Sequence, residues 1–137
     1  MTNVLIADND RAVSALLTEI LARTGLSVEH AYDGEAAQEM VRRGSYGVLV
    51  CDLDMPRASG LEVLESLRDL ASPPAVVVIS GYLDGEVAQR LGALPFVREV
   101  LRKPFDLLAF AGRIRALATP GGHDLTATPP ADAVVGG

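Results

Sequence analysis

Cysteine, lysine and long apolar runs are all scarce in this chain of 137 residues. The single cysteine, Cys51, excludes an internal disulfide or a multi-cysteine metal site, and we expect it to be buried in a strand of a cytoplasmic protein. Lysine occurs once, as Lys103, because this chain uses arginine for its other basic residues. The longest apolar runs span four to five residues and predict no membrane segment or signal peptide. A net charge of −6 argues against a nucleic-acid-binding surface.

The composition predicts one globular domain followed by a short tail. Apolar residues make up 49% of the chain and charged residues 22%, which is typical of a folded protein. A chain of this length can bury a core without metals or disulfides. Residues 119–137 are rich in proline and glycine and show no helical or strand period. We therefore expect a domain over residues 1–118 and a flexible tail or linker over residues 119–137.

Strand-like and helix-like apolar patterns alternate along the first 118 residues. Short β-prone runs predict strands at 4–7, 26–30, 48–51, 75–79 and 96–101. Apolar residues at helical spacing predict helices at 13–21, 33–43, 61–70, 84–91 and 105–117. Asp10 is expected to cap the first helix and Gly25 to end it.

This alternation predicts an α/β fold with a five-stranded parallel sheet and helices on both faces. The first, third and fourth runs are continuously apolar, as strands buried on both faces are. The second run is interrupted by Ser27 and Glu29. The fifth is interrupted by Arg98 and Glu99, so these two strands are expected at the edges. The order 2-1-3-4-5 satisfies both conditions and is the flavodoxin-like, doubly wound arrangement.

Polar residues end four of the predicted strands, where an open α/β sheet binds its ligands. They are Asp8, Asp52, Ser80 and Lys103. Two carboxylates about 4 Å apart repel by roughly 4 kcal/mol at an effective dielectric constant near 20, so the pair needs a cation or a reactive role. Mg²⁺ binds carboxylates together with phosphate oxygens, and a carboxylate beside it can attack a phosphoryl group. A lysine and a hydroxyl would then contact the phosphoryl oxygens, so these residues indicate phosphoryl transfer.

Four segments together resemble the receiver domain of bacterial two-component response regulators. They read VLIADND from residue 4, VLVCDLDMP from residue 48, VVISG from residue 77 and LRKPF from residue 101. The resemblance covers residues 3 to about 118. It implies that Asp52 is the phosphoacceptor and that Ser80 and Lys103 bind the phosphoryl group. The donor would be a phosphohistidine on a sensor histidine kinase or a phosphotransfer protein.

The resemblance also implies a Mg²⁺ cofactor. Asp8 would hold the ion, with Asp52 and the backbone carbonyl of Asp54 as further ligands. Asn9 stands where the family usually has a second acid; it offers a neutral oxygen, so we expect weaker Mg²⁺ binding. The domain would be no enzyme beyond its own phosphorylation. It would act on an unknown downstream protein as a monomer or weak homodimer, without contacting nucleic acid or a membrane.

A second departure from the family lies at Val100. The family often has an aromatic residue there, whose ring moves inward when the hydroxyl residue engages the phosphoryl group, so the usual coupling from Ser80 lacks this ring. Tyr82 is placed to affect access to the phosphoryl group. In the family, the face formed by the fourth helix, fifth strand and fifth helix often contacts partners. Here that face would include Val87, Leu91, Val97, Val100 and Ile114.

Two alternative functions remain open from the sequence. The Asp-Leu-Asp segment beginning at Asp52 also resembles the first motif of haloacid-dehalogenase-type phosphatases, although the acidic segment that this family places after its lysine is missing after Lys103. The other alternative is a pseudo-receiver, an interaction module that has the fold but little phosphotransfer. Asn9 and Val100 motivate this second alternative.

Overall fold

Five parallel strands and five α-helices alternate along the described part of the computed structural model, which is residues 3–44, 46–54, 59–81, 83–103 and 106–118. The strands are β1 (Asn3–Ala7), β2 (Ser27–Ala31), β3 (Val48–Asp52), β4 (Ala75–Ser80) and β5 (Val97–Arg102). The helices are α1 (Arg11–Ala22), α2 (Gly34–Arg43), α3 (Gly60–Ser66), α4 (Gly85–Gly92) and α5 (Leu107–Ala118), with a 3-10 turn, η1, at Leu67–Asp69. The sheet order β2-β1-β3-β4-β5 confirms the predicted fold.

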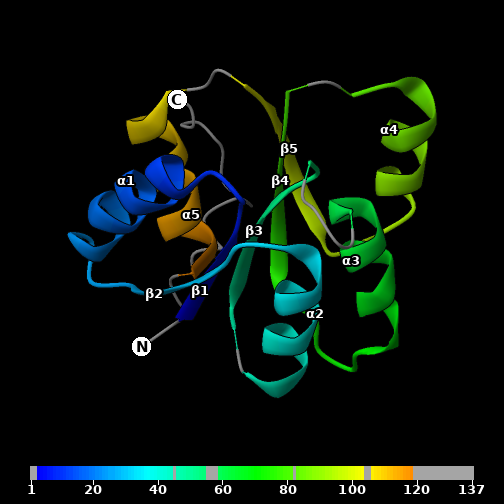
Figure 1. Ribbon diagram of the computed structural model, residues 1–137, viewed down its shortest axis with the longest axis horizontal. Coiled ribbons are helices and arrows are strands. Elements are labelled where there is room, and N and C mark those ends of the chain that lie inside the picture. Colours follow the sequence, from blue (N-terminus) through cyan, green and yellow to red (C-terminus); the bar gives the residue numbers. More distant parts are fainter. Residues whose placement is uncertain (1–2, 45, 55–58, 82, 104–105, 119–137) are drawn as a thin grey trace, which may run out of the picture.

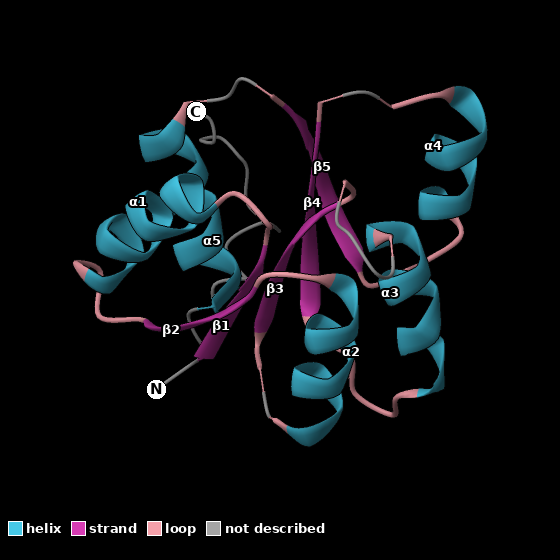
Figure 2. Ribbon diagram, viewed as in Figure 1, coloured by secondary structure: helices cyan, strands magenta, loops and turns pink. Residues whose placement is uncertain are grey.

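Helices cover both faces of the sheet (Figures 1 and 2), with α1 and α5 on one side and α2, α3 and α4 on the other. Alternate residues of each central strand supply the two cores. Ile6 of β1 packs in the same cluster as Leu17 of α1 and Phe110 of α5. Its neighbour Leu5 packs in the opposite cluster with Leu64 of α3. This period of two explains why the central strands are apolar at every position except their polar end residues.

The central and edge strands are those that the sequence predicts. β1, β3 and β4 are buried over almost their whole length, whereas β2 is partly exposed. β5 alternates between half-buried and exposed residues, with Arg98, Val100 and Arg102 on the exposed side. The polar interruptions in the second and fifth runs therefore mark the edges of the sheet.

A side-chain oxygen caps the start of each helix. The capping residues are Asp10, Asp33, Ser59, Asp84 and Asp106. Asp10 accepts hydrogen bonds from the backbone N–H groups of Ala12 and Val13, which confirms the predicted cap. Gly25, with φ of 87°, turns the chain after α1 in a conformation that favours glycine. The capping residue before each helix therefore determines where that helix begins.

The end of α3 and the start of α5 differ from the predicted bounds for identifiable reasons. α3 ends at Ser66 rather than continuing to Leu70. The Ser66 hydroxyl bonds to a carbonyl of the preceding turn, and the chain then tightens into η1. α5 begins at Leu107 because Asp106 caps it. Phe105, which is predicted to belong to this helix, lies outside the described residues.

The buried face of α5 also differs from the predicted one. Leu108 is predicted on the apolar face, but it is 75% exposed. It lies in the first turn, where the side chain of Asp106 accepts its N–H, and it points away from the core. Phe110, Ala111 and Ile114 form the buried face against α1 and the sheet.

No helix in the described ranges is long and apolar enough to cross a membrane. The predicted tail, residues 119–137, lies outside the described residues. The domain bounds 1–118 and the flexible tail therefore stay predictions.

Gly60 lies where the start of α3 passes closest to the end of β3. A Cβ atom on Gly60 would lie 2.5 Å from the carbonyl oxygen of Asp52 and 2.6 Å from the Cα of Leu53. We expect Gly60→Ala to lower the free energy of unfolding by about 1–3 kcal/mol, because backbone atoms must shift. Urea unfolding measures this change. Gly112→Ala is the control: nothing lies within 4 Å of its Cβ, so it should stabilise α5 by up to about 1 kcal/mol. Equal effects would contradict the close approach.

Candidate functional site

Two carboxylates are buried side by side at the carboxyl edge of the sheet. Asp52 ends β3 and Asp8 directly follows β1; these strands are neighbours, with Ala7 opposite Cys51. Asp8 is 0% exposed and Asp52 is 1% exposed. The Asp8 N–H donates to the carbonyl of Ala31 at the end of β2, over 3.0 Å. Three strand ends therefore fix the position of this acidic pair.

Asp52 is held by one cation and one backbone amide. Lys103 Nζ lies 3.0 Å from Asp52 Oδ2, and the N–H of Asp54 donates to Asp52 Oδ1 over 2.9 Å. Burial acts to lower the pKa of Lys103, but the hydrogen bond to Asp52 and the nearby carboxylates outweigh burial and raise this pKa. The lysine is therefore a cation at neutral pH.

Asp8 carries an oxygen that nothing in the described structure satisfies. Its Oδ1 accepts the N–H of Asp10 over 2.8 Å, whereas its Oδ2 is buried without a hydrogen-bond partner. Burial and the charge of Asp52 raise the pKa of Asp8 to about 6, although the N–H of Asp10 and the charge of Lys103 act in the opposite direction. A buried, unpartnered carboxylate oxygen is unfavourable, so it suits a proton or a cation.

The four predicted site residues lie in a row along one edge of the sheet. β1, β3, β4 and β5 are adjacent, and the residues at their ends are Asp8, Asp52, Ser80 and Lys103. Ser80 is 0% exposed, and its carbonyl accepts the N–H of Lys103 over 2.9 Å. The backbone of β4 therefore fixes where the lysine leaves β5.

The donor set of this edge fits Mg²⁺. Asp8 and Asp52 offer carboxylate oxygens, which this cation prefers, and the orphaned Oδ2 of Asp8 lacks a partner. Among the described residues, no three acidic, histidine or cysteine side chains form a metal cluster. Backbone oxygens and water would therefore complete the shell, as is usual for Mg²⁺. Asn9 is exposed in the turn before α1, and Asp54 is exposed after β3.

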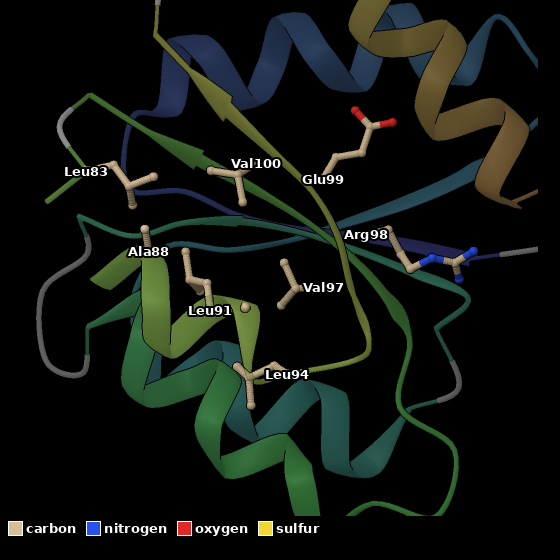
Figure 3. Close-up of a pocket in the computed structure, with 9 residues that line it drawn as sticks. Leu83, Ala88, Leu91, Leu94, Val97, Arg98, Glu99 and Val100 are labelled. Atoms are coloured by element: carbon tan, nitrogen blue, oxygen red, sulfur yellow. The ribbon is translucent and has the colours of Figure 1, made fainter. Parts of the chain in front are cut away.

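A groove, and not an aromatic ring, occupies the outer side between α4 and β5. Val100 is 38% exposed and lines a groove of about 240 Å³ with Val97 and Leu91 (Figure 3). Leu91 is almost fully buried. Ile114, which is expected on this face, is instead buried in the core beneath α1 and α5, so this expectation is wrong. Tyr82 lies outside the described residues.

Cys51 is buried in β3, as predicted. Burial, and then the negative charges of Asp52 and Asp8, raise the pKa of its thiol. Because the thiolate is the reactive form, Cys51 is inert in the folded domain.

Sequence reasoning missed a stack of side chains on α1 and β2. The guanidinium carbon of Arg11 lies 4.0 Å from the centre of the Tyr32 ring. Tyr32 stacks on His30, with centroids 5.7 Å apart and planes within 5°. No spacing in the sequence gives His30 a metal-ligating partner; it bonds instead through Nε2 to Thr18, and burial lowers its pKa. Only the fold brings these positions together, so no local pattern signals them.

A buried aspartate between a lysine and a second aspartate, on a doubly wound sheet, defines the class of phosphoryl-accepting signalling domains. The model of the response regulator receiver domain family matches residues 4–115, and the chain belongs to this family. It is a receiver domain of two-component signalling, and the match favours this function over the phosphatase alternative.

Response regulators from several organisms are similar to this chain. Response regulator MprA of Mycobacterium leprae is 40% identical over 115 residues, which are 83% of this chain and 50% of the relative. The chain spans about half the length of the curated relatives it matches. The receiver domain of Francisella response regulator 1452 is 25% identical, with a TM-score of 0.77 over 86% of this chain and 97% of that one. Thermotoga maritima TrrA, solved in complex with Mg²⁺-BeF, is 25% identical, with a TM-score of 0.72 over 85% and 99%.

The buried acidic pair predicts how stability depends on pH. Because the pKa of Asp8 is raised to about 6 in the folded state, its stabilising contribution is complete below the unfolded value of 3.8 and is lost as pH rises through 6. Asp8→Asn, which mimics the protonated acid, should therefore stabilise the metal-free domain by about 1–3 kcal/mol at pH 8. The gain should shrink between pH 6 and pH 4.

Urea unfolding at several pH values in EDTA measures this effect. Asp10→Asn is the matched control, because Asp10 is exposed and asparagine caps a helix equally well. A gain in stability of the same size for Asp10→Asn, or a gain for Asp8→Asn that is independent of pH, would contradict the assigned cause.

Proposed function

We propose that Asp52 is the phosphoacceptor of this receiver domain. One observation carries the proposal: the Asp52 carboxylate is 1% exposed, accepts the Asp54 N–H and is paired with Lys103 beside a second acid. A carboxylate fixed from two sides presents its oxygens in a constant direction, which is what phosphoryl transfer requires of the protein.

The covalent step joins an oxygen of Asp52 to phosphorus. As this bond forms, the bond from phosphorus to the nitrogen of a phosphohistidine breaks, and the nitrogen keeps the electron pair. Lys103 Nζ, now beside Asp52 Oδ2, would neutralise charge on the phosphoryl oxygens. The Ser80 hydroxyl would donate to a phosphoryl oxygen from the neighbouring strand end.

Asp8, Asp52 and the backbone carbonyl of Asp54 would hold Mg²⁺, with Asn9 as a neutral neighbour. When bound, the ion supplies positive charge that offsets the repulsion between the acids and the incoming phosphoryl group. The unpartnered Oδ2 of Asp8 supports this assignment. The protein's own contribution is to keep two carboxylates buried at adjacent strand ends.

The proposal includes a donor, an output and a location. The donor is a sensor histidine kinase or a phosphotransfer protein. The output is a contact between this domain, as a monomer or weak homodimer, and an unidentified downstream protein. We place these events in the cytoplasm, where a free thiol such as that of Cys51 is usual.

Intact mass after incubation with Mg²⁺ and acetyl phosphate tests the phosphoacceptor. We expect one labile phosphoryl adduct on the wild-type protein and none on Asp52→Asn. Asp54→Asn is the control, because it keeps the backbone carbonyl and should still be modified. An adduct that persists in Asp52→Asn would overturn the assignment, and no adduct on folded wild-type protein would favour the pseudo-receiver.

The missing second acid predicts a gain in metal affinity. Asn9→Asp adds a carboxylate in the turn beside Asp8 and should tighten Mg²⁺ binding by roughly threefold to tenfold, since ligand charge controls the affinity for hard cations. Calorimetric titration at pH 8 measures the dissociation constant. Gln89→Glu, which adds the same charge on the exposed surface of α4, should leave it unchanged. Equal affinities for Asn9→Asp and the wild type would exclude Asn9 from the metal site.

A further inference from the structure

Arg11 is an exposed arginine that is held in place by an aromatic ring and not by an acid. Its guanidinium carbon lies 4.0 Å from the centre of the Tyr32 ring, and within the described residues it forms no salt bridge. Four other exposed arginines differ in this respect. Arg23, Arg43, Arg90 and Arg113 each pair with a glutamate. The donor groups of Arg11 are therefore available for an anion from outside the domain.

The ring beneath Arg11 is itself fixed. Tyr32 stacks on His30, whose Nε2 bonds to the hydroxyl of Thr18. That hydroxyl already donates to the carbonyl of Ser14 over 2.7 Å, so it accepts from His30, and Nε2 carries the proton. The histidine ring is thus held in one tautomer, and the stack restricts the arginine to one side of α1. A cation whose position is fixed in advance loses less entropy when it binds an anion.

The stack is tied to the same strand ends as the acidic pair. Arg11 is the first residue of α1 and follows directly on Asp10, whose N–H donates to Asp8 Oδ1. Tyr32 follows directly on Ala31, whose carbonyl accepts the N–H of Asp8. Arg11 and Tyr32 therefore each follow directly on a residue that forms a backbone hydrogen bond with Asp8. This places Arg11 at the rim of the phosphoacceptor site.

We propose that Arg11 attracts the anionic phosphoryl group of the donor towards Asp52. This role rests on the proposed phosphoacceptor function. A phosphoryl donor is repelled by a chain of net charge −6 and by the two acids at the site. A fixed positive charge at the rim raises the local concentration of the anion and speeds its arrival. The same charge opposes the binding of Mg²⁺. Removing it should therefore slow phosphorylation but tighten Mg²⁺ binding.

The test compares two arginines on one helix. Arg11→Gln and Arg23→Gln remove the same charge at opposite ends of α1, about 18 Å apart by helix geometry. At 0.1 M ionic strength, where screening acts over about 10 Å, we expect Arg11→Gln to slow phosphorylation by acetyl phosphate about threefold. Arg23→Gln should match the wild type. At 1 M ionic strength the loss should disappear, because the screening length falls to about 3 Å.

Tyr32 variants and metal titration complete the test. Tyr32→Leu should lose part of the rate because the arginine is no longer held, whereas Tyr32→Phe keeps the ring and should match the wild type. Mg²⁺ should bind about twofold more tightly to Arg11→Gln than to the wild type, and its affinity for Arg23→Gln should be unchanged. A purely structural role for Arg11 would not move the two ligands in opposite directions.

The outcomes separate this inference from the proposed function. If the wild type forms no adduct, the phosphoacceptor proposal fails, and Mg²⁺ affinity alone then decides whether the charge of Arg11 acts at the site. An unchanged rate for Arg11→Gln, a loss that persists at 1 M ionic strength, or an equal loss in Arg23→Gln would overturn the role of Arg11. Unchanged Mg²⁺ affinity in Arg11→Gln would overturn it as well.

Discussion

Two buried carboxylates share one lysine, and this imbalance of charge governs the behaviour of the site. Lys103 contacts Asp52, whereas Asp8 keeps one oxygen without a partner. A proton on Asp8 or a bound cation can relieve the excess negative charge of the folded domain. The two compete, because protonated Asp8 binds a cation less tightly. The proposed function therefore links stability, metal affinity and phosphoryl transfer through a single pair of side chains.

The sheet places this pair at the ends of its deeply buried central strands. β1 and β3 are buried on both faces, so the strand ends that carry Asp8 and Asp52 are braced by two cores. The side of the sheet that carries α4 is packed differently. α4 buries only Leu91 among its described residues, and an exposed ion pair from Arg90 to Glu65 joins it to α3. A fixed site beside a lightly packed helix suits a domain whose chemistry is constant and whose surface must change.

The sequence predicts those features that depend on local pattern. Continuous apolar runs separate central from edge strands, and Asp10 caps α1 where an aspartate before an apolar helix should. Features that depend on packing between distant segments are missed. Leu108 is exposed because α5 packs on the sheet through a different face. The contact between Arg11 and Tyr32 joins α1 to the residue after β2. The orphaned oxygen of Asp8 is likewise a matter of geometry, because an aspartate in the sequence shows only that a carboxylate is available.

The use of basic residues follows from the same imbalance. At the half-buried position beside Asp52, a compact ammonium group donates to one oxygen, and the only lysine of the chain stands there. The rim has an aromatic ring that the flat guanidinium of Arg11 can cover. Exchanging the two side chains would put a forked cation where a point charge is needed and remove the planar group from the ring. In the proposed function, the inner cation would neutralise a bound phosphoryl group, while the outer one would attract the group before it binds.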